Sequence, residues 1–141
     1  MNVQNQAEVS ARVSGGCFCG AVRFALDLPS KWCAHCHCSM CRRIHGAGYV
    51  TWVGVESSHF HILQDGGQLQ WYESSPGARR GFCKTCGSSM LFESTRWSGE
   101  THVALACLDQ PIDRKPQAHA FHNAHVDWMA WDPNLPVINN P

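Results

Sequence analysis

The sequence has no excess of charge of either sign, because 11 basic and 11 acidic side chains give its 141 residues a formal net charge of +0. Proteins that bind nucleic acids usually carry a basic excess, so the balance argues against that class of partner. No apolar run approaches the roughly 18 residues of a membrane-spanning helix. The first 16 residues, MNVQNQAEVSARVSGG, lack the hydrophobic stretch of a signal peptide. We therefore expect no nucleic-acid partner, no membrane partner and a cytoplasmic location.

Internal repeats and low-complexity tracts are also missing, and 141 residues suit a single domain. The hydrophobic share of 44% is enough to bury a core without help from disulfides. We expect a flexible N-terminal lead-in over residues 1–14, one domain over residues 15–135 and a C-terminal tail over residues 136–141.

Cysteine, by contrast, is abundant. The chain has nine cysteines, and an odd number cannot all pair within one chain. Thiols stay reduced in the cytoplasm, and closely spaced pairs there usually bind metal. Three such pairs, of the form C-x-C or C-x2-C, are Cys17–Cys19, Cys36–Cys38 and Cys83–Cys86. We therefore expect these cysteines to bind metal rather than to form disulfides.

The spacing within each pair suits half of a tetrahedral zinc site. Alternate residues of an extended chain share a face, so C-x-C directs two sulfurs to one point. C-x2-C does the same around a tight turn, and a glycine after the second cysteine helps that turn by allowing a positive φ. Gly20 and Gly87 hold this position after Cys19 and Cys86. Two pairs would thus make one closed four-thiolate site.

The middle cysteines differ because three of them, Cys36, Cys38 and Cys41, lie close together. A site with three protein ligands keeps a fourth position for water or substrate, which is the catalytic arrangement. Spacing alone leaves open which pairs combine. Cys33 could close the second site as a fourth ligand, or form a zinc ribbon with Cys36 and the pair Cys83–Cys86. Two structural zincs and one structural plus one reactive zinc are equally compatible with the spacing.

Alternation of apolar and polar residues predicts a mainly β fold. In residues 21–28, Val22, Phe24 and Leu26 alternate with polar or small residues. Further strand-like stretches, with turn residues between them, cover residues 48–55, 59–63, 68–73, 88–93 and 101–108. One short helical turn is expected over residues 39–46. Residues 109–141 hold five of the seven prolines, so we expect an irregular segment that packs on the sheets through Trp128 and Trp131.

The chain resembles the glutathione-dependent formaldehyde-activating enzyme family, which also includes the centromere protein V group. The segments that carry the resemblance span most of the chain in the expected order: GGCFCGAVRF (15–24), CHCSMCRR (36–43), YESSPGARRGFCKTCGSSM (72–90) and the tail with its tryptophans and prolines. The three-part cysteine pattern, C-x-C, C-x-C-x2-C and C-x2-C, is highly specific.

The resemblance implies a pairing of the cysteine groups and a fold. Cys17, Cys19, Cys83 and Cys86 would bind a structural zinc, and Cys36, Cys38 and Cys41 a second, reactive zinc. The expected fold is a β-tent of antiparallel sheets built around the structural zinc, within a zinc-binding domain over residues 15–135. The implied reaction is that of a carbon–sulfur lyase, which adds glutathione to formaldehyde and gives S-hydroxymethylglutathione. The expected partners are a small-molecule thiol and an aldehyde.

Several residues near the motifs have expected roles. Arg42 and Arg43 follow Cys41 and could pair with the carboxylates of glutathione. Arg79 and Arg80 suit a solvated turn. Cys33 is expected to be a packed or partly exposed thiol, and Cys107 a core residue. His37 is expected at the surface or in contact with the metal ligands from behind. His119, His122 and His125 are three residues apart and could line a pocket, although this is not the favoured interpretation.

Two other interpretations compete with the enzyme. The protein could be a non-catalytic module that binds glutathione, another small thiol or a protein partner. It could also be a redox-sensing zinc protein in which Cys33 acts with Cys36, Cys38 and Cys41. The enzyme hypothesis depends on an open zinc position at these three cysteines and fails if both zincs are fully ligated by the protein.

Overall fold

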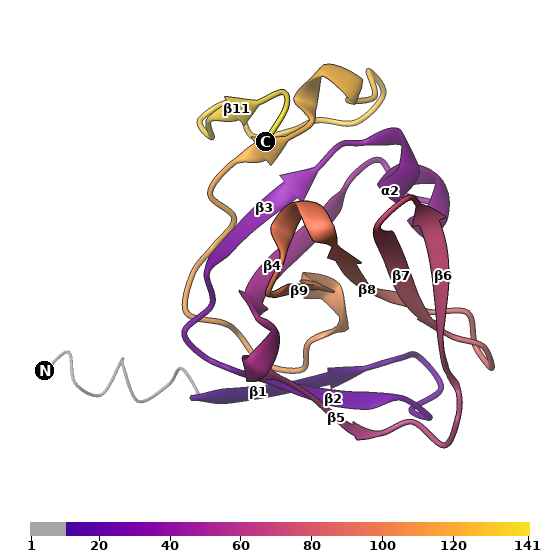
Figure 1. The fold of residues 1–141 in the computed structure, drawn as a ribbon. Coiled ribbons are helices and arrows are strands. Elements are labelled where there is room, and N and C mark those ends of the chain that lie inside the picture. The colour runs from indigo at the N-terminus through magenta and orange to yellow at the C-terminus, as the bar shows by residue number, and fades with distance from the viewer. Residues whose placement is uncertain (1–10) are drawn as a thin grey trace, which may run out of the picture.

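The computed structural model describes residues 11–141 and contains two β-sheets. The smaller, antiparallel sheet has the order β1-β2-β5 and lies along the bottom of Figure 1. Its strands are β1 (Arg12–Gly16), β2 (Arg23–Asp27) and β5 (Phe60–Gln64). Residues 12–14, part of the expected N-terminal lead-in, thus belong to β1. Residues 1–10 of that lead-in lie outside the described residues.

The larger sheet has eight strands, and the mainly β fold is therefore confirmed. In spatial order they are β11 (Val137–Ile138), β10 (His119–Ala120), β3 (Trp32–Cys36), β4 (Val50–Glu56), β9 (Glu100–Ala104), β8 (Ser89–Ser94), β7 (Ala78–Cys83) and β6 (Leu69–Ser75). The expected antiparallel pairing fails at β10, which runs parallel to both β3 and β11. Parallel neighbours need a long crossover, and residues 121–136 supply one between β10 and β11. The sheet is therefore mixed.

Helical structure is short and sits between strands. The helix α2 (Ser39–His45) begins after Cys38 and ends at Gly46, whose φ of 60° is in the left-handed region, as the predicted turn over residues 39–46 requires. Four 3-10 turns complete the set: η1 (Ser57–His59), η2 (Thr95–Trp97), η3 (Leu105–Cys107) and η4 (His122–Ala124). Within residues 11–141, no helix has both the length and the apolar character needed to cross a membrane.

Strand predictions succeed where apolar residues alternate and fail elsewhere. β2 lies within its predicted stretch, and β4, β5, β6, β8 and β9 each overlap a predicted stretch but extend beyond it by one or two residues. The predicted strand over residues 101–108 is too long, because the chain turns into η3 after Ala104. β3 and β7 were not predicted. Their sequences, WCAHC and ARRGFC, place cysteine, histidine and arginine where a typical strand has aliphatic residues.

The main core lies between the two sheets. Phe24 and Leu26 of the smaller sheet and Val53, Leu91 and Val103 of the larger one are each 0% exposed. They belong to one continuous cluster, which also contains Cys17 and Cys83. The two cysteines therefore lie at the edge of the packed interior, where the sheets meet.

The C-terminal segment crosses the end of the larger sheet, at the top of Figure 1. Trp131 packs edge-on against His119, His122 and His125, with ring centroids 4.1–5.9 Å apart. The expected packing through Trp128 is wrong, because that side chain is 71% exposed. The residues that pack against Trp131 are therefore histidines of the C-terminal segment, and Trp128 is not among them.

Truncation of Leu91 tests the packing between the sheets. Leu91→Ala is expected to lower the free energy of unfolding by about 2–5 kcal/mol, since it leaves a cavity at a fully buried position. Leu63→Ala removes the same atoms from a side chain that is 55% exposed, and should change it by less than about 0.5 kcal/mol. Urea denaturation of both variants measures the difference. Equal effects would contradict the assignment of the core.

Candidate metal centres and the adjoining clefts

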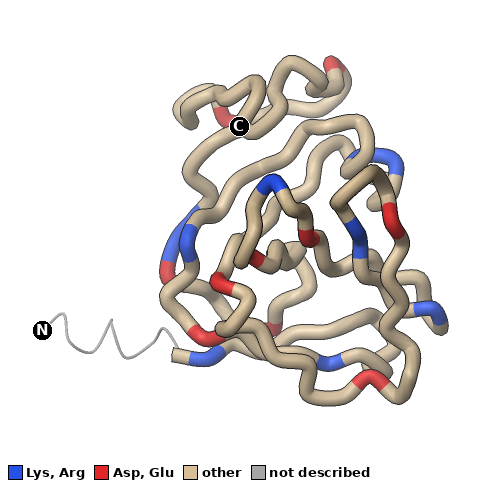
Figure 2. The backbone as a smooth tube through the Cα atoms, in the orientation of Figure 1, with Lys and Arg blue, Asp and Glu red and all other residues tan. Residues whose placement is uncertain are grey.

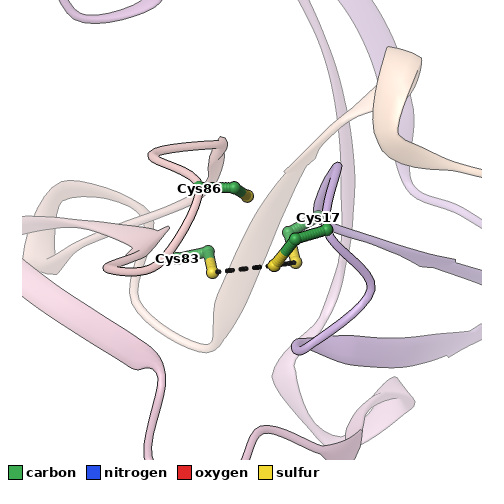
Figure 3. A group of neighbouring side chains, drawn as sticks. Cys17, Cys83 and Cys86 are labelled. Atoms are coloured by element: carbon green, nitrogen blue, oxygen red, sulfur yellow. Dashed lines mark hydrogen bonds between the residues drawn. The ribbon is translucent and has the colours of Figure 1, made fainter.

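The first cysteine group joins the two sheets. Cys17 and Cys19 lie in the connection between β1 and β2, Cys83 ends β7, and Cys86 lies in the turn before β8. The four sulfurs all lie within 4.8 Å of one another. Figure 3 shows the side chains of Cys17, Cys83 and Cys86 gathered from two separate loops. Segments that are 64 residues apart in the sequence therefore meet at this point.

The sulfur spacing of this group fits a zinc ion. Cys17 and Cys19 have their Sγ atoms 3.6 Å apart, and Cys19 and Cys83 theirs 3.8 Å apart. Tetrahedral zinc with Zn–S bonds of about 2.3 Å holds its sulfurs about 3.8 Å apart, whereas a disulfide bond is about 2.05 Å long. Hydrogen bonds from Ser88 lower the pKa of Cys86 to about 5, so this thiol already favours the charged form that metals bind.

The second group sits where β3 passes into α2. Cys36 ends the strand, Cys38 caps the helix, and Cys41 lies in its first turn. Their sulfurs lie within 4.8 Å of one another, with Cys36 and Cys41 3.6 Å apart. The helix forms there because the Cys38 sulfur accepts a hydrogen bond from the Cys41 backbone N–H at 3.3 Å. This group offers three donors, one fewer than the first.

Sequence reasoning missed Arg80, which is only 3% exposed and contacts the second group. Its Nη1 and Nη2 each donate to the Cys41 sulfur at 3.6 Å, and its guanidinium lies 4.8 Å from the centre of the Phe92 ring. The expected solvated turn is wrong at this residue, because Arg80 belongs to β7 and points inward. Arg79, its neighbour, points outward to Glu93 and the face of Trp71. The inward direction of a single arginine could not be predicted from the sequence, because it produces no alternation of apolar and polar residues.

The three thiols do not titrate alike. Hydrogen bonds from Cys36 and Cys41, and then the charge of Arg80, lower the pKa of Cys38. The pKa of Cys36 is raised, chiefly by its hydrogen-bond interactions with Cys38 and Cys41 and then by burial. One negative charge is therefore favoured on this group even without a metal. Further negative charge needs a cation, which Arg80 supplies only in part.

Arg42 and Arg43, the sequence candidates for carboxylate binding, lie on α2. Arg42 donates from Nε to the backbone oxygen of His37 at 3.4 Å. Both arginines, with Trp128, line a cleft of about 280 Å³. Figure 2 shows this basic stretch of α2 in blue at the upper right. The structure thus brings these arginines to an opening beside the second group, without contact to its sulfurs.

A larger cleft of about 490 Å³ is lined by residues that follow each cysteine group in the sequence. Its walls come from α2, the start of β4, the turn after Cys86 and η3. His45 and Ser89 are among its lining residues, and His45 Nε2 and Ser89 Oγ are buried and without hydrogen-bond partners among the described residues. Burial, then the charge of Arg80, lowers the pKa of His45 to about 4, so the ring is neutral at pH 7. Clefts of this size suit small molecules.

The remaining cysteines lie away from the second group's donors. Cys33 is 0% exposed on β3 and its pKa is raised to about 11 by burial, so it is a packed thiol. This removes support from the redox interpretation, which needs an accessible Cys33 thiolate. Cys107 was expected in a core strand but lies half-buried in η3, where it lines the larger cleft.

The histidines of the tail meet His37 behind the second group. His37 is 1% exposed and hydrogen-bonds through Nε2 to Nδ1 of His119 at 2.9 Å. His122 and His125 pack against the same ring. His37 therefore lies behind the second cysteine group, one of the two positions expected for it. Histidines far apart in the sequence gather here because β10 runs beside β3.

Comparison with known proteins agrees with these features. Residues 12–124 match the sequence profile of the family described as glutathione-dependent formaldehyde-activating enzyme. A crystal structure of a Rhodobacter sphaeroides protein superposes with a TM-score of 0.60 at 28% identity, covering 72% of this chain and 92% of that one.

Two curated relatives extend the comparison. A Halomonas elongata protein, whose name refers to glutathione-dependent formaldehyde activation, is 31% identical over 131 residues, 83% of this chain and 79% of that protein. A Schizosaccharomyces pombe protein, whose name calls it a lyase, is 27% identical over 123 residues, 77% of this chain and 85% of its own length. Since the family profile spans most of the chain, this protein belongs to the glutathione-dependent formaldehyde-activating enzyme family.

Proposed function

We propose that the protein is a zinc-dependent carbon–sulfur lyase-type enzyme, which adds a thiol such as glutathione to formaldehyde or a related small aldehyde. The observation that carries this proposal is the group of three converging sulfurs with the buried guanidinium of Arg80 beside it. A closed structural site would have a fourth protein donor, and among the described residues this group has none. Membership of the family supports the choice of thiol and aldehyde.

The proposal assigns two zinc ions per chain. Cys17, Cys19, Cys83 and Cys86 would hold the structural ion, as four donors that link the two sheets. Cys36, Cys38 and Cys41 would hold the reactive one. Zinc there, when bound, would favour the thiolate form of a substrate thiol and polarise a carbonyl oxygen.

The reaction itself needs little from the protein beyond position and charge. The sulfur of the thiol forms a bond to the carbonyl carbon, the C=O double bond becomes a C–O single bond, and the proton lost by sulfur ends on that oxygen. Three thiolates carry more negative charge than one divalent ion neutralises, and Arg80 offsets part of it. His45, in the wall of the larger cleft, is neutral at pH 7 and adds no charge to this group.

The clefts provide room for the thiol. The larger cleft, about 490 Å³, is lined by residues that follow the second cysteine group and Cys86 in the sequence. On the smaller cleft, Arg42 and Arg43 would pair with the carboxylates of glutathione. Lysine and arginine are interspersed with aspartate and glutamate along the rest of the described chain in Figure 2. Ion pairs with individual side chains, rather than an electrostatic field over a whole face, would therefore orient the substrate.

Zinc content separates the two cysteine groups. The purified wild-type chain is expected to hold two zincs, and Cys38→Ser one, with the melting temperature changed little. Cys38→Ser should also lose the glutathione-dependent removal of formaldehyde, measured above the spontaneous rate. Cys19→Ser, the matched control in the first group, should lower the melting temperature, because its site ties the sheets together.

Other outcomes would overturn the assignment. A Cys38→Ser variant that keeps two zincs would mean that this cysteine is no ligand. Two zincs and bound glutathione in the wild type, with no rate above the spontaneous one, would favour the alternative of a non-catalytic thiol-binding protein.

We expect Arg80 to affect the zinc affinity of the second cysteine group and not that of the first. Arg80→Gln removes the charge beside Cys41, so the zinc affinity of the second group should fall about 10–100-fold. Arg80→Lys should restore part of it. Arg79→Gln, one residue away but facing outward, should leave it within about twofold. Competition with a chromophoric zinc chelator measures all three, and equal losses in the variants at residues 79 and 80 would contradict the role.

A further inference from the structure

Five histidines meet on the face of β3 opposite the cysteine sulfurs. His35 and His37 come from β3 and its extension, and His119, His122 and His125 from the tail. The rings contact one another at centroid distances of 4.2–6.4 Å. Successive residues of an extended chain face opposite ways, so His37 points away from the side to which Cys36 and Cys38 point. The cluster is thus a separate feature from the second cysteine group.

The hydrogen bonds of the cluster determine the ring tautomers. His119 Nε2 donates to the backbone oxygen of Asp132 at 2.8 Å, because a carbonyl oxygen can only accept. In its neutral form His119 therefore accepts at Nδ1, and His37 donates its Nε2–H there. His37 Nδ1 is left with a bare lone pair. His125 Nδ1 likewise donates to the backbone oxygen of His122 at 2.7 Å, which leaves Nε2 of His125 as a lone pair.

Two ring nitrogens of the cluster are buried and have no hydrogen-bond partner among residues 11–141. They are Nδ1 of His37 and Nε2 of His122, in side chains that are 1% and 9% exposed. Buried polar atoms in folded proteins almost always have a hydrogen-bond partner, so each such atom calls for an explanation. Metal-binding histidines characteristically donate their other ring N–H to a backbone carbonyl or a similar acceptor. His37, through His119, and His125 both follow that rule.

The ring positions are compatible with a shared ion. An ion bound about 2.0–2.1 Å from a ring nitrogen lies about 3.2 Å from the ring centroid, so two imidazoles at a tetrahedral angle have centroids about 5.2 Å apart. The centroids of His37 and His122 are 5.2 Å apart. His125 stacks on His122 at 4.2 Å but lies 6.4 Å from His37.

His125 is the ring that must move. Among the described residues, three donor atoms lie within 4.8 Å of one another only in the two cysteine groups, so at least one histidine must turn to complete a three-nitrogen site. His125 is exposed, whereas His37 and His122 are buried. Its ring can therefore turn toward the other two, and its side of the cluster gives an ion access from solvent.

We propose that His37 Nδ1, His122 Nε2 and His125 Nε2 form a third metal site, which takes a divalent first-row transition ion. Three neutral imidazoles suit zinc, nickel or copper rather than calcium or magnesium, which prefer oxygen ligands. The site lies outside both cysteine groups and is independent of the reaction proposed above.

Nickel binding to the zinc-loaded protein tests this site under anaerobic conditions. The wild type is expected to bind one added Ni²⁺ with weak ligand-field bands and without the intense charge-transfer absorption of nickel thiolates. His122→Gln and His125→Gln should each weaken this binding at least about tenfold. His125→Gln is the safer variant, because that side chain is exposed whereas His122 is buried.

Two controls separate this site from other sources of nickel binding. His61→Gln, on β5 in the other sheet, should bind nickel like the wild type. Cys38→Ser should also keep the nickel site, since the proposed ligands exclude cysteine. The proposal is overturned if the wild type binds no added nickel, if His125→Gln and His61→Gln bind it equally, or if thiolate charge-transfer bands accompany the binding.

Discussion

The convergence of four cysteine sulfurs at the junction of the two sheets is the contact on which the remaining structure depends. Cys17 and Cys19 follow the first strand of the small sheet, and Cys83 and Cys86 connect two strands of the large one. The small sheet has three strands and one buried face, and such a sheet gains much of its stability from what it packs against. A metal link at the hinge of the two sheets would hold the core between them closed.

The strand β7 connects the two cysteine groups, so the position of one affects the other. It ends in Cys83, at the first group, and three residues earlier it places Arg80 against Cys41, in the second. A displacement of Cys83 would therefore move the cation that offsets the charge on the second group. In this arrangement the first cysteine group does more than join the sheets, because it also determines where a buried positive charge lies.

Some of these features can be predicted from the sequence, and others cannot. The cysteine spacing leads directly to the two groups, since C-x-C and C-x2-C direct sulfurs to one point by local geometry alone. The strands β2 and β4 can be predicted for a similar reason, because the alternation of their apolar residues is also a local pattern. Arg80 and the histidine cluster depend on contacts between distant segments, which no local pattern records. β10 joins β3 only in the folded chain, and the sequence gives no reason to expect His119 beside His37.

The parallel pairing of β10 with β3 also imposes an order of assembly. Cys36 and Cys41 are five residues apart and can meet as soon as their short segment has been synthesised. Cys19 and Cys83 meet across 64 residues, and His37 and His119 across 82. Loop closure costs more entropy as the loop lengthens. During synthesis on the ribosome, the second cysteine group is therefore the first that can bind metal. The first cysteine group can form only after Cys86 has been added, and the histidine cluster forms last.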